Sequence, residues 1–149
     1  MPGKSTQNEN EATVRRLFEE MDKGNVNVLD ELSTPDYLLH FPEIPGAMHR
    51  EEAKRLFKEL YVAFPGLRHA IEDQVAGGGY VAARVVLRAT RPGASRGTPP
   101  KRDPVGVRSI NTFHFSGGKL AEQWVEFDLA QLGSWPRPGN RKADRENKE

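Results

Sequence analysis

The chain has 149 residues and a nearly balanced charge, with 22 Lys and Arg residues against 21 Asp and Glu residues. This length fits a single domain, and a content of 36% hydrophobic and 29% charged residues is typical of a soluble globular protein. The balanced charge argues against a general nucleic-acid-binding protein, which carries a basic excess. The absence of cysteine excludes disulfides, thiolate metal ligands and cysteine nucleophiles.

The sequence offers no signal for a membrane or for export. No apolar run approaches the roughly 20 residues that a transmembrane helix requires. The opening residues, MPGKSTQNEN, lack the apolar core of a signal peptide. We therefore expect a cytoplasmic protein without membrane association.

Three helices are predicted in the first half of the chain, after a polar stretch, residues 1–8, that we expect to be disordered. The first helix, over about residues 10–23, is indicated by apolar residues at the spacing i, i+3, i+4 and i+7, namely Val14, Leu17, Phe18 and Met21. A short second helix should be capped by Asn25 and end before Pro35. The third, over about residues 53–64, shows the same periodicity and ends at Pro65-Gly66.

The second half predicts four long antiparallel strands, over residues 68–75, 80–90, 105–115 and 119–128. Glycine-rich turns join them in pairs, and a loop rich in proline and glycine spans about residues 92–103. Helices followed by a meander of strands predict an α+β fold. Because three helices cannot cover a curved four-stranded sheet, we expect an internal pocket. We also expect a homodimer, since Trp124 and the apolar row from Val81 to Ala89 offer contact surface.

Three stretches of the chain resemble the SnoaL-like polyketide cyclases, which are part of the NTF2-like superfamily. These are VRRLFEEMDKGNVNVLDELSTPDYLLHF (14–41), AFPGLRHAIEDQVAGGGYVAARVVLRAT (63–90) and FHFSGGKLAEQWVEFDLAQLG (113–133). The resemblance implies an NTF2-like cone over residues 9–133, with a curved antiparallel sheet wrapped around N-terminal helices and an internal pocket. Residues 134–149 are expected to be a disordered tail. The superfamily also holds isomerases, dehydratases, epoxide hydrolases and proteins without catalysis, so the fold does not decide the function.

The last predicted strand carries a departure from the family pattern. Alternation places Gln123, Val125 and Phe127 toward the pocket and Trp124 and Glu126 away from it. In the family this stretch commonly reads His-Trp-Asp, and the Asp is the acid/base of the ring-closing members. Here Val125 stands in that position, and valine cannot transfer a proton. Glu126 could replace the carboxylate only if a bulge shifted the strand by one residue.

Candidate catalytic residues follow from this pattern. His40 matches a family histidine at the pocket, and histidine is suited to proton transfer near neutral pH; a structural histidine is the open alternative. Asn111 and Gln123 can polarise a carbonyl or stabilise an enolate oxygen. We expect the substrate to contact Leu38, Phe57, Tyr61, Arg84, Phe113, Val125 and Phe127. For Arg84, an exposed position on the convex face is the favoured alternative, because arginine is rarely buried without a partner.

The remaining histidines, His49, His69 and His114, fall at a helix start or at positions expected to face outward, and they receive no role. They show no metal-ligand spacing such as HExxH, so we predict neither a metal nor an organic cofactor.

Two functions remain open at this point. The first is a cyclase-type lyase or isomerase that moves a proton on a small, mostly apolar, carbonyl-bearing substrate. The second is a non-catalytic small-molecule-binding or dimeric interaction protein on the same fold, favoured by the missing carboxylate at Val125. An epoxide hydrolase would need two carboxylates facing the pocket, and the sequence predicts none there. The sequence does not decide whether the chain is an enzyme.

Overall fold

The computed structural model describes residues 4–90 and 104–127 of the chain. Its helices are α1 (Lys4–Asp22), α2 (Val28–Leu32) and α3 (Arg50–Ala63). Its strands are β1 (Ser33–His40), β2 (Met48–His49), β3 (Arg68–Gly77), β4 (Tyr80–Thr90), β5 (Pro104–Ser116) and β6 (Lys119–Phe127). The expected loop over residues 92–103 and the expected tail over residues 134–149 lie outside the described residues.

Helix α1 begins earlier than the sequence predicted. It starts at Lys4 instead of near residue 10, so residues 4–8 are helical and the expected disorder does not extend over them. No proline or glycine interrupts residues 4–10, and extending a helix costs far less than starting one. The predicted apolar stripe is correct, because Val14, Leu17, Phe18 and Met21 are all buried.

The second helix has a different cap from the one predicted. Asn27 is the N-cap of α2, and it forms no side-chain capping bond. The Asn25 side chain instead donates to Glu20 across 3.4 Å. Helix α3 follows the prediction closely, and the chain leaves it through Gly66, whose φ of +77° favours glycine.

The strands form one curved sheet in the order β2-β1-β6-β5-β4-β3. Two tight turns join β3 to β4 and β5 to β6, and both place their glycine pairs at positive φ. The predicted strands are all present. The expectation of a purely antiparallel sheet is wrong in one place, since β1 pairs in parallel with β6 through Leu39 and Gln123.

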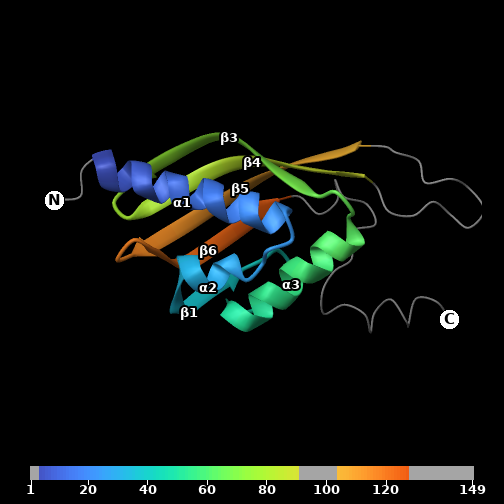
Figure 1. Cartoon of the computed structure of the whole chain (residues 1–149), viewed down its shortest axis with the longest axis horizontal. Helices are drawn as coiled ribbons and strands as arrows, with labels where there is room; N and C mark the ends of the chain where they lie inside the picture. The colour runs from blue at the N-terminus through green and yellow to red at the C-terminus, as the bar shows by residue number, and fades with distance from the viewer. Residues whose placement is uncertain (1–3, 91–103, 128–149) are drawn as a thin grey trace, which may run out of the picture.

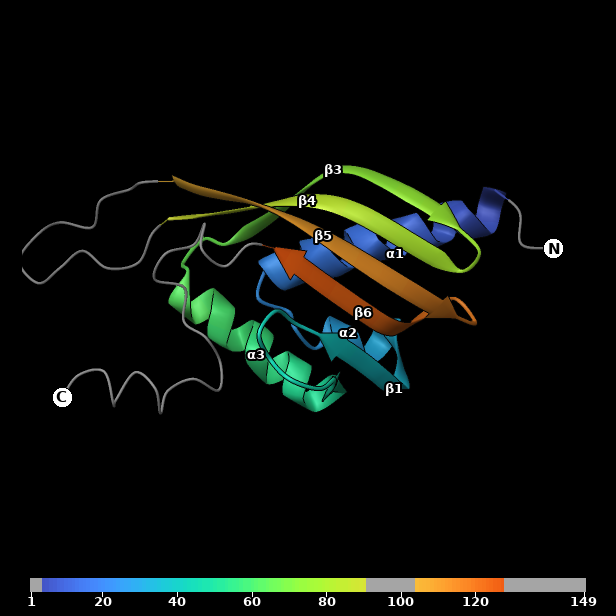
Figure 2. The same cartoon turned by 180° about the vertical axis from the view of Figure 1, so that it is seen from behind.

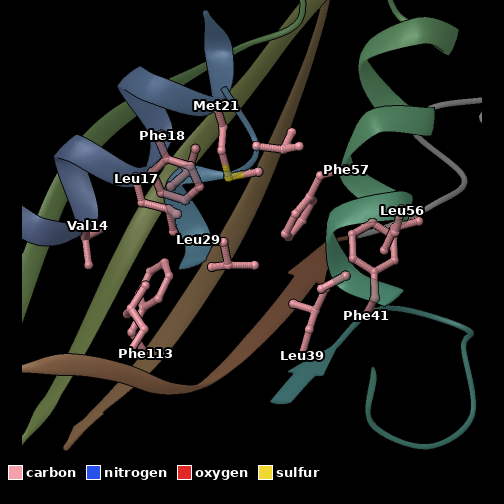
Figure 3. Packing of buried hydrophobic residues seen from close by; sticks show 14 of the residues in the cluster. Val14, Leu17, Phe18, Met21, Leu29, Leu39, Phe41, Leu56, Phe57 and Phe113 are labelled. Carbon is pink, nitrogen blue, oxygen red and sulfur yellow. The ribbon is translucent and has the colours of Figure 1, made fainter. Parts of the chain in front are cut away.

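All three helices lie on one face of the sheet (Figure 1), as the view from behind makes plain, because there the sheet stands in front of them (Figure 2). Side chains from α1, α3 and β1 meet between helices and sheet, where Leu17, Phe57 and Leu39 are buried (Figure 3). The described part of the chain therefore has two layers, with one core between them.

The buried layer changes the argument for a homodimer. The β4 residues Val81, Ala83, Val85 and Leu87 face this core and are buried within the chain itself, so they offer no surface to a partner. Trp124 lies on the opposite face, which also exposes Tyr80 and Ile110. The homodimer stays a prediction, with the outer face of the sheet as a candidate surface.

A bulge in β3 decides which side chains reach the inside. From the turn backward, Gln74 pairs with Ala83 and Asp73 with Arg84, but the next pair joins Ile71 to Val85. Glu72 is therefore an extra residue without a partner on β4, and both Glu72 and Asp73 are exposed. Because of this extra residue, the β3 side chains before Glu72 face the opposite side of the sheet from the one that a regular strand would give them.

Candidate active site

A mostly apolar cavity lies between α1, α3 and the inner face of the sheet. The space free of protein atoms within the cavity and in the open solvent at its mouth amounts to about 490 Å³. Its apolar and aromatic walls come from Phe18, Met21, Phe41, Phe57, Leu60, Tyr61, Leu67, Leu87, Val125 and Phe127. The polar side chains that line it are His69, Ser109, Asn111 and Gln123. Few polar groups in an apolar hollow are typical of a small-molecule site.

His69 lines this cavity and is paired with the carboxylate of Asp22. The His69 Nδ1 atom lies 2.8 Å from Asp22 Oδ1, and the His69 backbone N–H donates to Asp22 Oδ2 across 2.9 Å. Each of the two side chains is 13% exposed. Asp22 is the last residue of α1 and His69 the second residue of β3, so the pair joins the helix end to the start of the sheet's edge strand.

Two aromatic side chains hold this pair in place. The Phe18 ring stacks on the His69 imidazole with 4.4 Å between centroids and 14° between planes. The Tyr61 hydroxyl donates to Asp22 Oδ1 across 2.6 Å. Burial raises the pKa of Tyr61 well above its ordinary range, and the hydrogen bond to Asp22 adds to the rise. Tyr61 therefore remains a neutral donor to the Asp22 carboxylate.

The arrangement gives His69 one defined tautomer. An ionised Asp22 only accepts hydrogen bonds, so the proton of a neutral His69 lies on Nδ1 and Nε2 keeps its lone pair. Nε2 has no hydrogen-bond partner within residues 4–90 and 104–127. A carboxylate that orients an imidazole and stabilises its protonated form is the arrangement that general-base catalysis uses.

A second polar feature crosses the sheet beneath the cavity. Tyr37 donates to Gln123 Oε1 across 2.7 Å, and Gln123 Nε2 donates to Asn111 Oδ1 across 3.3 Å. Asn111 Nδ2 then donates to Ser109 Oγ across 3.2 Å, and Ser109 donates to the Val85 carbonyl across 3.3 Å. We call these four side chains the polar chain. Its side chains come from β1, β6 and β5, its last bond reaches the backbone of β4, and all four side chains are buried.

The structure brings most of the predicted site residues to the cavity. Asn111 and Gln123 line it, as do four of the seven residues expected to contact substrate, namely Phe57, Tyr61, Val125 and Phe127. Phe113 is fully buried with its ring edge-on to Phe18, and it supports the wall from behind without lining the cavity. The catalytic and binding roles of these residues stay predictions.

Three predicted residues lie on the other face of the sheet. Strand β1 turns Tyr37 and Leu39 inward, so Leu38 and His40 face outward. His40 bonds the Glu122 carboxylate and stacks on Trp124 with 5.3 Å between ring centroids. Leu38 and His40 therefore do not line the inner cavity, and the expectation that they lie at the pocket is wrong.

Arg84 lies on that outer face as well. It forms two hydrogen bonds to Asp73, of 2.7 Å and 2.9 Å, with 63% of its side chain exposed. The guanidinium holds the pKa of Asp73 below its ordinary value. The convex-face interpretation of Arg84 is the one that the geometry supports.

Sequence reasoning missed His69 because of the β3 bulge. Counted straight back from the turn, His69 falls opposite Arg88 on the outer face. The extra residue Glu72 instead places it opposite Leu87, on the inner face. The available signal was the charged pair Glu72-Asp73, which breaks the alternation of the strand. Nothing in the sequence pointed to Asp22, which reads as an ordinary helix-end residue.

Residues 4–90 and 104–127 contain neither a metal-binding cluster nor a membrane-spanning helix. No three His, Asp or Glu side chains there are grouped so that they could hold a metal ion. No helix in that part of the chain is long and apolar enough to cross a membrane.

A curved sheet backed by helices on one face, with a largely apolar cavity between the two layers, defines an α+β cone. The chain belongs to the SnoaL-like polyketide cyclase family, whose model matches residues 12–134. The predicted family and fold are confirmed. The comparison with curated proteins gave no match.

Solved structures support the same assignment. IdmH from Streptomyces antibioticus, a proposed polyketide cyclase, is 29% identical with a TM-score of 0.73, over 83% of this chain and 98% of its own. A proposed SnoaL-like polyketide cyclase from Jannaschia sp. CCS1 is 25% identical with a TM-score of 0.76, over 91% and 96%. AclR from Streptomyces galilaeus, a proposed hydroxylase, is 21% identical with a TM-score of 0.70, over 87% and 99%, and shares the fold.

Proposed function

We propose that the chain is a cofactor-independent lyase or isomerase of the cyclase type, with His69 as its proton carrier. The substrate is a small, mostly apolar molecule with an acidic carbon next to a carbonyl group. In this assignment His69 takes the role that the sequence suggested for His40. Asn111 and Gln123 keep their predicted role at the substrate oxygen.

The reaction needs only groups that the cavity holds. His69 Nε2 takes a proton from the acidic carbon, and the C–H electron pair moves onto the carbonyl oxygen to give an enolate. The N–H groups of Asn111 and Gln123 hold that oxygen. Asp22 stabilises the imidazolium that forms. The enolate carbon then attacks a second carbonyl of the substrate, whose C=O π electrons move onto its oxygen, and that oxygen takes the proton from His69 Nε2. In an isomerase the enolate instead takes the proton back at carbon, and in both cases His69 returns to its neutral form.

The observation that carries this proposal is the buried Asp22–His69 pair at the cavity wall. Family members of the ring-closing type use a carboxylate where this chain has Val125, so a proton carrier must come from another element. His69 on β3 lines the same cavity as Val125. Its carboxylate partner and its free Nε2 give it the chemistry that Val125 lacks.

Hydrogen–deuterium exchange tests the proposal without knowledge of the natural substrate. The protein would be placed in D₂O with a panel of β-keto esters and aromatic carbonyl compounds, and NMR would follow exchange at the acidic carbon. We expect faster exchange than in buffer, and a loss of about 10²-fold to 10⁴-fold of that acceleration in His69→Gln. The matched variant His40→Gln, which changes the outer histidine, should keep it.

The outcomes separate the two open functions. Binding of the panel compounds without faster exchange would make the chain a non-catalytic binding protein whose apolar wall includes Val125. Exchange that survives in His69→Gln and fails in His40→Gln would return the proton-carrier role to the outer face.

A further inference from the structure

Tyr37 stands at one end of the polar chain and does not touch the cavity. Its side chain is fully buried, and its hydroxyl lies 2.7 Å from Gln123 Oε1, the one hydrogen-bond partner it has within the described part of the chain. Burial raises the pKa of Tyr37 far above its ordinary range, so the hydroxyl keeps its proton. A buried hydroxyl without an acceptor costs the free energy of its lost hydration. Tyr37 must therefore donate, and Gln123 must accept.

The direction of the remaining bonds follows from this one donation. With its oxygen turned to Tyr37, Gln123 presents its nitrogen to Asn111, which accepts with its own oxygen. The Asn111 nitrogen is then turned toward Ser109. An amide carries both a donor and an acceptor, so the two amides alone would fit either direction. Ser109 supports the same direction while its single proton is donated to the Val85 carbonyl, but it can give up that bond and donate to Asn111 instead.

We propose that Tyr37 is a positioning residue that sets the direction of the polar chain and thereby restricts the site to ligands with an acceptor oxygen, such as a ketone, an ester or an enolate. The inference deepens the proposed function and rests on the same cavity. Its test, however, measures binding and needs no turnover.

The chemistry of the two amides explains this restriction. Each amide nitrogen carries two hydrogens, and the polar chain uses one of them. The second hydrogen of Asn111 and of Gln123 is left for the cavity that both residues line. A buried N–H without an acceptor is costly, so a bound molecule that brings an oxygen is favoured over one that brings only carbon. Without the Tyr37 donor, the chain can reverse and the two nitrogens are no longer fixed.

Two ligands of nearly equal shape test the proposal, namely indan-1-one and its hydrocarbon counterpart indane. Their dissociation constants would be measured by NMR titration for the wild type and Tyr37→Phe. We expect Tyr37→Phe to bind indan-1-one about fivefold to tenfold more weakly, the effect of one net hydrogen bond. Its affinity for indane should change by less than about twofold. The ratio of the dissociation constants of variant and wild type is taken for each ligand separately, so the different hydrophobicity of the two compounds does not affect the comparison.

Two controls keep the test decisive. Tyr80→Phe removes a hydroxyl from a half-exposed tyrosine on the outer face and should leave both affinities unchanged. If Tyr37→Phe does not fold, Asn111→Leu should show the same selective loss for indan-1-one. In the wild type, indan-1-one should shift the side-chain amide signals of Asn111 and Gln123 in ¹⁵N-resolved spectra, and indane should leave them in place.

The outcomes are distinct from those of the exchange experiment. An equal loss of affinity for both ligands in Tyr37→Phe would show that Tyr37 only supports packing, and would overturn the inference. Failure of the wild type to bind indan-1-one, or unchanged amide signals on binding, would overturn it as well. A selective loss without any hydrogen–deuterium exchange would uphold the inference and remove the catalytic proposal.

Discussion

Two histidine–carboxylate pairs lie on opposite faces of the same sheet. His69 and Asp22 face the core, and each side chain is 13% exposed. His40 and Glu122 face outward, and their side chains are 37% and 29% exposed. Both imidazoles bond a carboxylate and stack on an aromatic ring, Phe18 inside and Trp124 outside. The two pairs thus share their residue types and differ in their surroundings.

The surroundings decide which pair is equipped for catalysis. The inner pair borders a mostly apolar cavity, where charges interact more strongly than in water and where the proposed substrate would be held. The same wall carries the amides of Asn111 and Gln123, the proposed donors to the substrate oxygen. The outer pair borders a shallow, open hollow formed by Phe41, Pro42, Trp124 and residues 125–127. A histidine beside a carboxylate is therefore a weak sign of a site until the cavity is known.

The largest effect should come from the carboxylates of the two pairs. We expect Asp22→Asn to lower the exchange rate of a β-keto ester by roughly 10²-fold, because an amide no longer fixes the His69 tautomer or stabilises the imidazolium. Glu122→Gln is the matched change on the outer face and should stay within about twofold of the wild type. Exchange rates at several substrate concentrations would separate a loss in kcat, which we expect, from a loss in KM.

An equal loss in both variants would contradict the comparison between the faces. It would mean that the outer pair acts on the inner one through the sheet. A loss in Glu122→Gln alone would place the chemistry in the outer hollow.

Most of the fold could be predicted from the sequence. Spacing of apolar residues predicted α1 and α3, and glycine pairs predicted both tight turns between strands. The boundaries were less certain, as the start at Lys4 shows, because helix ends depend on local cooperativity rather than on the buried stripe. The parallel pairing of β1 with β6 was missed, since it joins segments more than 80 residues apart and leaves no local signal.

For the site, alternation worked where the strands were regular. Asn111, Gln123 and Val125 were predicted on the inner face, and they line the cavity. The same rule misplaced His69, because one unpaired residue reverses the phase of a strand. The family match led to His40, whose position on β1 is fixed by the burial of its neighbours Tyr37 and Leu39.

The burial of Tyr37 on the inner face should also make the free energy of unfolding depend on pH in the alkaline range. The pKa of Tyr37 is raised by burial in the folded chain, whereas a free tyrosine in the unfolded chain ionises near pH 10. The stability that the neutral phenol contributes is therefore complete below about pH 10 and is lost as the pH rises further. We expect the free energy of unfolding to fall by up to about 1.4 kcal/mol per pH unit from this one group.

Urea unfolding between pH 8 and about pH 11.5 would measure this dependence. Tyr37→Phe should be less stable than the wild type at pH 8 and fall less steeply above pH 10. Parallel curves for the two proteins above pH 10 would show that Tyr37 ionises in the folded chain, and would remove the premise that it must donate to Gln123.

The smallest effect should come from deleting Glu72, the residue that causes the bulge. Without it, Ile71 opposite Val85 and Asp73 opposite Arg84 become neighbouring pairs of a regular ladder, and His69 remains opposite Leu87. We therefore expect exchange within about threefold of the wild type and little change in stability, as for other exposed positions. Deleting Gln74 is the matched control, because it shortens the chain by one residue as well. It moves the Asp73 carboxylate opposite buried Ala83, on the inner face, so we expect the free energy of unfolding to fall by roughly several kcal/mol. If the Glu72 deletion instead abolished exchange while the protein stayed folded, the bulge itself, and not only the inward direction of His69, would be required at the inner pair.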